Sequence, residues 1–546
     1  MIETPSPSQN KPVTTEQTPL ELIVVGAGFA GLYALYRAQA SGRSALAFER
    51  GGDVGGTWYW NRYPGARCDV QSMEYSYSFD EDLQQSWDWS ERYAAQPEIL
   101  KYANHVSDRF ALRDRIQFNT SVIGLRYLAE HQVWRVETSN NDMYFARFCI
   151  MATGCLSSTN LPDFEGRDSF AGEAYHTGQW PHEPVNFKNK RVGIIGTGSS
   201  SIQSIPIIAR ECKHLTVFQR TANYSIPAHN GPIDEAYAQS IKADYHSFRA
   251  LNRQMFAAFG AHSSRWEESV FDLDETARDE KFEARWSEGG LGFSSSFSDT
   301  GSDLKANQIA AEFVRNKIRA TVKDPIVAEQ LCPDQVIGCK RVCVDTDYYA
   351  TYNLPHVKLV SVKDNPIERI TPQGLVVGDQ EFEFDVLIFA TGFDAMTGTL
   401  LKINIEGRDG ITLTEKWADG PKTYLGLCIQ GFPNLFTVSG PGSPSVLSNM
   451  IVTIEQHINW IMDCLDAMAE RSANSIEATI DAESNWVHSG NEIAAGTLFP
   501  TCNSWYLGAN VPGKPRIFMP YVGGFPNYVA VCQEVADNDY PGFSFG

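Results

Sequence analysis

The sequence predicts an α/β protein with two Rossmann-like dinucleotide-binding domains and a helical insertion. Two Gly-x-Gly loops, beginning at Gly26 and Gly196, each follow an apolar strand-like run and precede a helical one. Two similar strands end in Ala-Thr-Gly at 152–154 and 390–392, where the chain is expected to pass from one nucleotide domain to the other. Because the second of these follows the second loop, the chain is predicted to return to its first domain.

The first loop has the pattern of an adenine-dinucleotide site. Gly26, Gly28 and Gly31 form Gly-x-Gly-x-x-Gly after the strand-like run 21–25. In a βαβ unit these glycines allow a tight turn, a close approach of the backbone to a pyrophosphate, and close packing of helix on strand. The next apolar run ends at Glu49, where a carboxylate can accept hydrogen bonds from an adenosine ribose. This order of elements predicts an FAD site.

The second loop differs from the first at two places. Ser201 takes the third position, which predicts a slightly wider spacing of helix and strand. The following strand ends in Gln219-Arg220-Thr221 and not in an acid. A guanidinium and a hydroxyl bind a ribose 2′-phosphate that a carboxylate would repel, so an NADPH site is predicted. Its expected contacts are Gly196, Thr197, Gly198, Ser199, Ser200, Ser201, Arg220 and Thr221.

The insertion is visible in the composition of residues 234–330, which are rich in Ala, Glu, Lys and Arg. Ala310, Val314, Ile318 and Val322 recur every four residues, which predicts an amphipathic helix. The Gly- and Ser-rich residues 286–298 predict a flexible break. The predicted limits are a disordered tail over 1–19, an FAD domain over 20–152 and 391–546, an NADP domain over 153–230 and 331–390, and the insertion over 231–330.

Composition favours an enzyme of two or three domains. The 546 residues are 43% hydrophobic, which suffices for sizeable cores. A formal net charge of −21 argues against nucleic acid or an anionic membrane as a partner. The tail lacks the apolar segment of a signal peptide, and the apolar residues 22–36 are too few to span a bilayer. We therefore expect a cytoplasmic protein with no membrane partner and no obligate protein partner.

The eleven cysteines are odd in number and scattered, which predicts free thiols in a reducing compartment. Cys339 and Cys343 have the spacing C-x3-C. A pyridine-nucleotide disulfide reductase shares the double Rossmann plan but needs a redox pair such as C-x2-C or C-x4-C, and neither spacing is present. No Cys/His cluster has zinc spacing, so no metal is predicted.

Two further motifs resemble those of type I Baeyer–Villiger monooxygenases, flavoenzymes that insert one oxygen atom of O2 beside a ketone carbonyl. Residues 170–181 fit F-x-G-x-x-x-H-T-x-x-W-P, and residues 55–69 fit G-G-x-W-x-x-x-x-Y-P-G-x-x-x-D. The resemblance runs from about residue 20 to the C-terminus, with Ser201 as a departure. The first motif contributes Phe170, Gly172, His176, Thr177, Trp180 and Pro181.

The resemblance implies further contacts with the two coenzymes. Lys340 would join Arg220 on the 2′-phosphate, and Arg341 would reach the flavin. Residues 440–450 and 504–514 resemble the phenylacetone and steroid monooxygenase branch, which implies a pocket for aryl-alkyl, cyclic or steroid-like ketones shaped by Ser445, Val446 and Leu447. The implied FAD contacts are Gly56, Thr57, Trp58, Asp69, Tyr75 and Met450, and the further NADP contacts are Arg67, Cys68, Lys340, Arg341 and Trp505.

In this family a ketone and O2 give an ester or lactone through a peroxyflavin, and the resemblance makes Arg341 and Asp69 the catalytic residues. A permanently charged guanidinium stabilises the peroxide and the developing alkoxide, and Asp69 would orient it. His176 is expected to act as a hinge or hydrogen-bonding residue rather than a base. An N- or S-hydroxylating flavin monooxygenase and a non-catalytic NADPH-binding redox sensor stay open, although the second would not require Asp69, Lys340 and Arg341 together.

Overall fold

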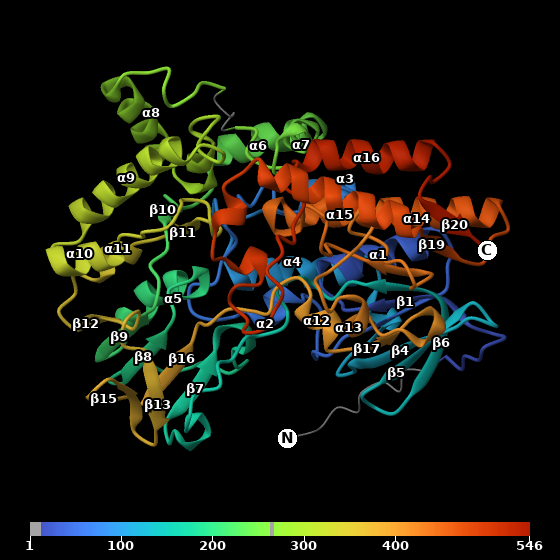
Figure 1. Cartoon of the computed structure of the whole chain (residues 1–546), viewed down its shortest axis with the longest axis horizontal. Coiled ribbons are helices and arrows are strands. Elements are labelled where there is room, and N and C mark those ends of the chain that lie inside the picture. The colour runs from blue at the N-terminus through green and yellow to red at the C-terminus, as the bar shows by residue number, and fades with distance from the viewer. Residues whose placement is uncertain (1–11, 263–266) are drawn as a thin grey trace.

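Two sheets organise the chain in the computed structural model, which describes residues 12–262 and 267–546 (Figure 1). The first has the order β17-β4-β5-β6-β1-β2-β3, with β18 beside β6. β1 pairs in parallel with β2 and β6, whereas β4, β5 and β6 are antiparallel neighbours. The strands are β1 (Leu20–Val25), β2 (Ala45–Phe48), β3 (Ile116–Gln117), β4 (Val122–Leu128), β5 (Val133–Thr138), β6 (Met143–Met151), β17 (Asn404–Glu406) and β18 (Leu435–Thr437).

The second sheet is entirely parallel, in the order β12-β9-β8-β16-β7. Its strands are β7 (Glu173–His176), β8 (Arg191–Ile195), β9 (His214–Gln219), β12 (Val357–Ser361) and β16 (Val386–Phe389). Small sheets join β10 (Ser225–Pro227) to β11 (Cys343–Asp345), β13 (Ile367–Thr371) to β14 (Gly374–Val377) and β15 (Gln380–Glu383), and β19 (Ile476–Ala478) to β20 (Phe543–Phe545).

Helices follow both glycine loops and complete the α/β architecture predicted from the sequence. The α-helices outside the insertion are α1 (Phe29–Ala40), α2 (Thr57–Trp60), α3 (Glu81–Ser86), α4 (Gln96–Arg109), α5 (Ser199–Ala209), α11 (Tyr348–Thr351), α12 (Gly398–Leu401), α13 (Leu413–Lys416), α14 (Met450–Glu470), α15 (Ile480–Ala495) and α16 (Phe525–Asp537). The core around α1, α4 and α14 is separate from the core around α5, which contains the insertion from Val270 onward.

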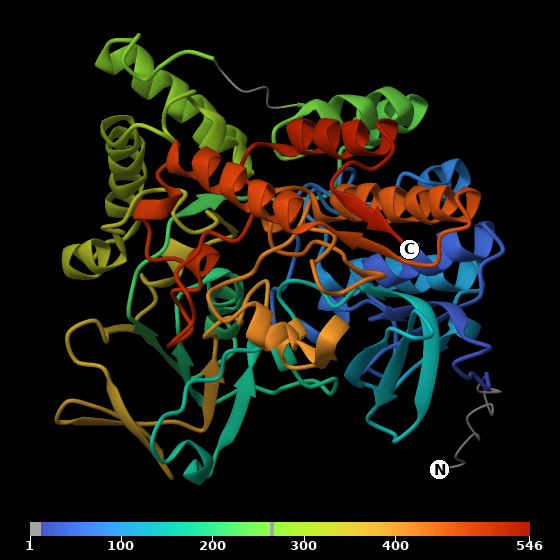
Figure 2. The same cartoon turned by 45° about the vertical axis from the view of Figure 1, so that its right-hand side comes forward.

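The insertion is helical, as predicted, and it reaches both halves of the molecule. It contains α6 (Glu235–Ala243), α7 (Tyr245–Gln254), α8 (Glu275–Glu288), α9 (Leu304–Thr321) and α10 (Pro325–Leu331). α8, α9 and α10 lie on the side of the second sheet, while α6 and α7 lie along α16 (Figures 1 and 2). α9 buries Ala310, Val314 and Ile318, the stripe read from the sequence.

Two local expectations are corrected. The break after α8 is not a flexible stretch: it forms a 3-10 turn over Gly290–Ser295, and Phe293 is buried against Phe282 with ring centroids 5.6 Å apart. The apolar residues within this Gly- and Ser-rich run explain the difference, because they bury their rings in the insertion core. Residues 1–11 of the predicted tail lie outside the described residues. The hydroxyl of Thr14 accepts a hydrogen bond from the Phe145 amide, so the part of the tail from Thr14 onward contacts the folded chain.

Candidate active site

Both glycine loops pack closely against the backbone of the Ala-Thr-Gly segments. Gly26 has φ +107°, and a methyl group there would lie 2.5 Å from the Ala152 carbonyl oxygen. Gly196 has φ +110°, and a methyl group there would lie 2.4 Å from the Ala390 carbonyl oxygen. Only glycine combines this backbone conformation with such a close approach. Each loop therefore packs directly on the residue that follows a strand of the same sheet, Ala152 after β6 and Ala390 after β16.

The two loops differ at their third position, as the sequence indicates. A methyl group at Gly31 would lie 1.9 Å from the Gly26 carbonyl oxygen. In the second loop, Ser201 is fully buried and its hydroxyl donates to the Gly196 carbonyl oxygen at 2.7 Å. A hydroxyl-bearing side chain thus fits where the first loop has contact between backbones.

The helix N-termini behind both loops fit a dinucleotide pyrophosphate. α1 begins after Gly28 and α5 after Gly198, and neither N-cap makes a side-chain hydrogen bond. A methyl group at Gly198 would meet nothing within 4 Å. Uncapped amides at a helix N-terminus are donors for phosphate oxygens. The chain thus supplies two phosphate cradles, one for each predicted dinucleotide.

Glu49 stands at the end of β2, where a ribose is expected. Its carboxylate is buried, and it accepts hydrogen bonds from the amides of Ala27 at 2.9 Å and Gly51 at 2.8 Å. Beyond the loop, the Trp58 indole donates to the Tyr75 hydroxyl at 3.2 Å, and the two rings meet edge to face. Both predicted aromatic contacts of the flavin thus form one wall.

The predicted catalytic pair is formed across 272 residues of chain. Arg341 donates to both carboxylate oxygens of Asp69, at 2.5 and 3.0 Å, and to the Val446 carbonyl oxygen at 2.6 Å. Burial disfavours the charge of Arg341, but the charge and hydrogen bonds of Asp69 outweigh it and raise the pKa of the guanidinium. A guanidinium has five N–H groups, so Arg341 keeps donors for a further acceptor.

Apolar side chains gather beside Arg341. Val446 and Tyr506 are buried in this cluster, and Leu447, Met450 and Trp505 pack against it. The segment Ser445–Leu447 forms a 3-10 turn before α14. Ser445 is fully buried and its hydroxyl donates to the Ser439 carbonyl oxygen at 3.0 Å. Of the three predicted pocket residues, Val446 and Leu447 therefore contribute the apolar surface.

Two cations lie together at the end of β9. Arg220 is exposed and Lys340 is half-buried. Burial and the charge of Arg220 lower the pKa of Lys340. Neither side chain forms an ion pair among residues 12–262 and 267–546; the Asp334 carboxylate, which pairs with Lys363, opposes the lowering of the Lys340 pKa from a longer distance. Thr221 closes the loop through its carbonyl oxygen, which accepts from the Thr197 hydroxyl at 2.9 Å. Two neighbouring cations that are not neutralised by an ion pair fit a dianionic phosphate.

The residue 170–181 motif lies between the second loop and the second Ala-Thr-Gly segment. The Thr177 and Ser200 hydroxyls are 3.0 Å apart. His176 accepts from the Gly178 amide through Nδ1, and Nε2 lies 3.3 Å from the Thr391 hydroxyl. Burial lowers the pKa of His176 to about 4, so the ring is neutral. These contacts support the hinge or hydrogen-bonding role. Of the other motif residues, Trp180 is buried, Phe170 and Pro181 are half-buried and Gly172 is exposed.

The residue 55–69 motif packs on the second domain. Gly65 has φ +82°, and a methyl group there would lie 2.3 Å from the Gln203 carbonyl oxygen on α5. The Gln203 amide donates to the Arg67 carbonyl oxygen at 3.0 Å. The Arg67 guanidinium pairs with Glu91 at 2.5 Å, and Cys68 is buried with its sulfur accepting from the Val70 amide. In this structure Arg67 and Cys68 thus use their side chains for protein contacts.

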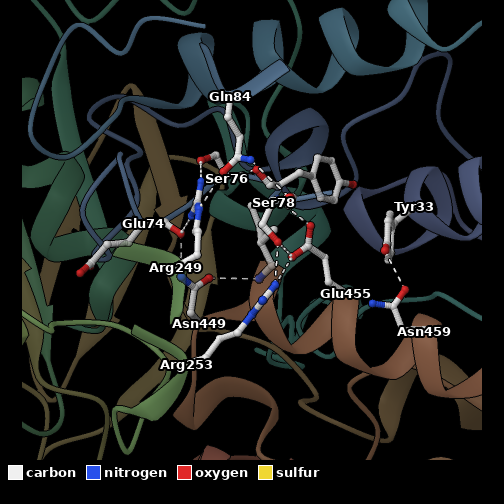
Figure 3. A network of polar contacts seen from close by, with 12 residues as sticks. Tyr33, Glu74, Ser76, Ser78, Gln84, Arg249, Arg253, Asn449, Glu455 and Asn459 are labelled. Carbon is white, nitrogen blue, oxygen red and sulfur yellow. Dashed lines mark hydrogen bonds and ion pairs between the residues drawn. The ribbon is translucent and has the colours of Figure 1, made fainter. Parts of the chain in front are cut away.

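A polar network that the sequence reasoning missed fixes the flavin-side wall to the insertion (Figure 3). Arg249 of α7 is buried, and it donates to the Ser76 hydroxyl at 2.6 Å and the Glu74 carbonyl oxygen at 3.1 Å. Asn449 donates to the same carbonyl oxygen at 2.9 Å. Because Tyr75 lies between these residues and Met450 follows Asn449, the network positions both sides of the predicted flavin site.

Glu455 extends this network along α14. Its buried carboxylate accepts from the Ser78 amide and hydroxyl, both at 2.6 Å, and the half-exposed Arg253 lies 3.7 Å away (Figure 3). Burial raises the pKa of Glu455. The only local signal for this network was the Asn449 N-cap, since the other partners lie far apart in the chain.

The expectation that all cysteines are free thiols is wrong for one pair. Cys339 and Cys502 form a disulfide, with Cα atoms 5.5 Å apart and 163 residues of chain between them. Nine described cysteines are free. The pairing was not visible in the spacing because it depends on which loops the fold brings together.

Two classes of feature are absent from the part of the chain that the structure describes. None of its helices has the length and apolar character needed to cross a membrane. No group of three or more His, Cys, Asp or Glu residues lies together there as metal ligands.

Comparisons with known proteins show which families and relatives this chain resembles. A family described as pyridine nucleotide-disulphide oxidoreductase matches residues 23–251. A Baeyer–Villiger monooxygenase from Pseudooceanicola batsensis is 41% identical over 97% of this chain and 97% of its own. A phenazine N-monooxygenase from Lysobacter antibioticus is also 41% identical, over 97% of this chain and 98% of its own.

The solved structures that resemble this chain are also monooxygenases. An oxidised steroid monooxygenase bound to NADP matches with a TM-score of 0.92 and 48% identity, over 97% of this chain and 99% of its own. A closed cyclohexanone monooxygenase matches with a TM-score of 0.94 and 40% identity, over 97% of this chain and 99% of its own. The higher identity to the steroid enzyme agrees with the branch indicated by residues 440–450.

Proposed function

We propose, since the chain belongs to the Baeyer–Villiger monooxygenase family, that it uses FAD and NADPH to convert ketones and O2 into esters or lactones. The observation that carries this proposal is Arg341, held by both oxygens of Asp69 beside an apolar cluster. A fixed cation with spare donors next to apolar side chains suits a reaction in which negative charge develops on the oxygen of an apolar ketone.

FAD, when bound, would accept a hydride from NADPH and deliver the electrons to O2. Each protein group then has a simple task. The amides behind Gly28 and Gly198 bind the pyrophosphates, and Arg220 with Lys340 binds the 2′-phosphate. The spare N–H groups of Arg341 stabilise the carbonyl oxygen of the ketone as it becomes an alkoxide.

Asp69 acts on the geometry of this step. Its two oxygens fix the plane of the Arg341 guanidinium, and the Val446 carbonyl oxygen fixes a third N–H. Because the donors are oriented before the ketone arrives, little reorganisation is needed when its charge develops. The apolar side chains of Val446, Leu447 and Met450 exclude water and contact the ketone substituents.

We assign residues 20–152 and 391–546 to the FAD domain, 153–230 and 331–390 to the NADP domain, and 231–330 to the insertion. We also place the enzyme in the cytoplasm, without an obligate protein partner. The net charge of −21 argues against an anionic membrane surface as a partner.

The test is product analysis by mass spectrometry with purified protein, NADPH, O2 and a panel of ketones. We expect a yellow protein with non-covalent FAD that inserts one oxygen atom beside the carbonyl. Aryl-alkyl and steroid-like methyl ketones should be oxidised with higher kcat/KM than cyclohexanone, because Val446 and Leu447 are of medium size. A colourless protein that takes up no FAD would contradict this proposal.

Oxygenation of a heteroatom is the second candidate, because one full-length relative, at 41% identity, is a phenazine N-monooxygenase. An aromatic nitrogen heterocycle in the same panel separates the two activities. An N-oxide formed faster than any ester would favour the second candidate.

A further inference from the structure

The Cys339–Cys502 disulfide lies between the two segments that would hold the nicotinamide coenzyme. Cys339 directly precedes Lys340 and Arg341 in the loop between α10 and β11. Cys502 lies between two 3-10 turns, Phe499–Thr501 and Trp505–Leu507. One bond therefore joins the phosphate-side loop to the segment that carries Trp505.

Besides the disulfide, the two segments interact where Tyr506 lies close enough to the Arg341 guanidinium for its hydroxyl to feel that charge. Within the described chain, no hydrogen bond or ion pair connects residues 336–342 to residues 498–518. The phosphate-side loop is anchored separately, because Asn307 of α9 bonds both the amide and the carbonyl oxygen of Ile337 at 3.0 and 2.9 Å. The far end of the Trp505 segment is anchored by Lys514, which contacts Asp394 at 2.6 Å. At the near end the Leu498 amide donates to the Gly301 carbonyl oxygen at 3.0 Å, and the disulfide is the covalent link to the phosphate-side loop.

We propose that Cys339 and Cys502 form a redox latch: the disulfide holds the Trp505 segment over the Lys340–Arg341 loop, and reduction releases it. This proposal rests on the assignment of Lys340 and Trp505 to the coenzyme. The latched form retains NADP+, whereas the reduced form lets the segment move away and the coenzyme leave. Release of a product or opening of a covering segment limits the turnover of many enzymes, so the latch controls the rate.

The thiol chemistry balances with a hydroperoxide and a dithiol. In oxidation, one cysteine ionises and its thiolate attacks hydrogen peroxide, which gives a sulfenic acid and a hydroxide that takes up the released proton. The second thiol then attacks the sulfenic sulfur, and its proton leaves with the hydroxyl group as a second water. In reduction, a dithiol attacks one sulfur, the other leaves as a thiolate, and the second thiol of the reductant closes its own disulfide. Two electrons and two protons are exchanged each way.

The environment of the two sulfurs assigns their roles. Cys339 is 4% exposed, whereas Cys502 is half-buried between the exposed residues Thr501 and Asn503. An external dithiol therefore attacks Cys502, and Cys339 is the leaving group. Exposure of the attacked sulfur is what thiol exchange requires.

The experiment compares peroxide-treated and dithiothreitol-treated holoenzyme after removal of both reagents. Alkylation and peptide mass spectrometry report whether Cys339 and Cys502 are joined, and titration reports the Kd for NADP+. We expect the reduced enzyme to bind NADP+ at least about fivefold more weakly, the lower end of coupling between linked sites. Cys502→Ser should match the reduced enzyme under both treatments.

Cys332→Ser is the matched control, because Cys332 is a free and half-buried thiol near the same loop. It should keep the full difference between the oxidised and reduced forms. Equal Kd values in the two forms of the wild type, or two free thiols after peroxide treatment, would overturn the latch. A wild type that binds no NADP+ in either form would instead contradict the coenzyme assignment.

Discussion

Replacing Arg341 with alanine removes the charged group on which the proposed reaction depends. The variant loses two hydrogen bonds to Asp69 and one to the Val446 carbonyl oxygen. It should still bind FAD, because no contact from Arg341 reaches the loop at Gly26 or Glu49. Formation of ester should fall much more than oxidation of NADPH, because the guanidinium stabilises charge on the ketone oxygen.

The expected size of both effects follows from these contacts. Loss of a preorganised donor to an oxyanion lowers the rate by on the order of a hundredfold, or about 2.7 kcal/mol. Charge-assisted hydrogen bonds contribute roughly 1.5 to 3 kcal/mol each when buried. Both side chains of the pair are 23% exposed, so solvent screening reduces this sum to about 2 to 4 kcal/mol of stability. The folded state of an ordinary domain tolerates such a loss.

The assay measures ester by gas chromatography, hydrogen peroxide by a coupled reaction, and NADPH by absorbance. Arg408→Ala is the matched control. Arg408 forms an ion pair with Glu477, with a nitrogen–oxygen distance of 2.5 Å, and this pair lies outside the proposed site. The control should lose stability without losing ester. The reasoning is refuted if Arg341→Ala yields as much ester per NADPH as the wild type.

Three further perturbations test other parts of the site. Arg220→Ala should weaken NADPH binding by about ten- to a hundredfold through lost phosphate contacts while NADH use changes little; equal loss with both coenzymes would assign Arg220 another role. Arg249→Lys loses the fork that holds Ser76 and the Glu74 carbonyl oxygen, so a larger share of NADPH should be oxidised without product, whereas Arg253→Lys, at a half-exposed position, should couple normally. Identical coupling in the two variants would remove Arg249 from this role. The His176 pKa of about 4 lies below the unfolded value of 6.5, so the neutral ring stabilises the fold above about pH 6.5 and this contribution is lost as pH falls. From pH 7 to pH 5 the loss should be about 2 kcal/mol, and His176→Asn should show a correspondingly smaller drop in the free energy of unfolding by denaturant titration; an unchanged drop would contradict the reasoning.

The sequence by itself was sufficient for the architecture and for the nucleotide loops. Gly26 and Gly196 combine a positive φ with a carbonyl oxygen about 2.5 Å from any added methyl group, a requirement that only glycine meets. Such positions leave a local mark in the sequence, as does the four-residue repeat of α9. The Arg341–Asp69 pair was also predicted, although its assignment came from motif resemblance rather than from spacing.

Tertiary structure alone decided the contacts between distant segments. Cys339 and Cys502 are 163 residues apart, Arg249 reaches Ser76 across 173 residues, and Glu455 reaches Ser78 across 377. It also turned the Gly- and Ser-rich stretch after α8 into a packed turn. Hydrogen bonds and disulfides form between groups that are close in space. The number of residues between two groups along the chain does not determine whether the fold brings them close. Local backbone requirements are therefore readable from the sequence, whereas the polar network around Arg249 and Glu455 and the Cys339–Cys502 disulfide are not.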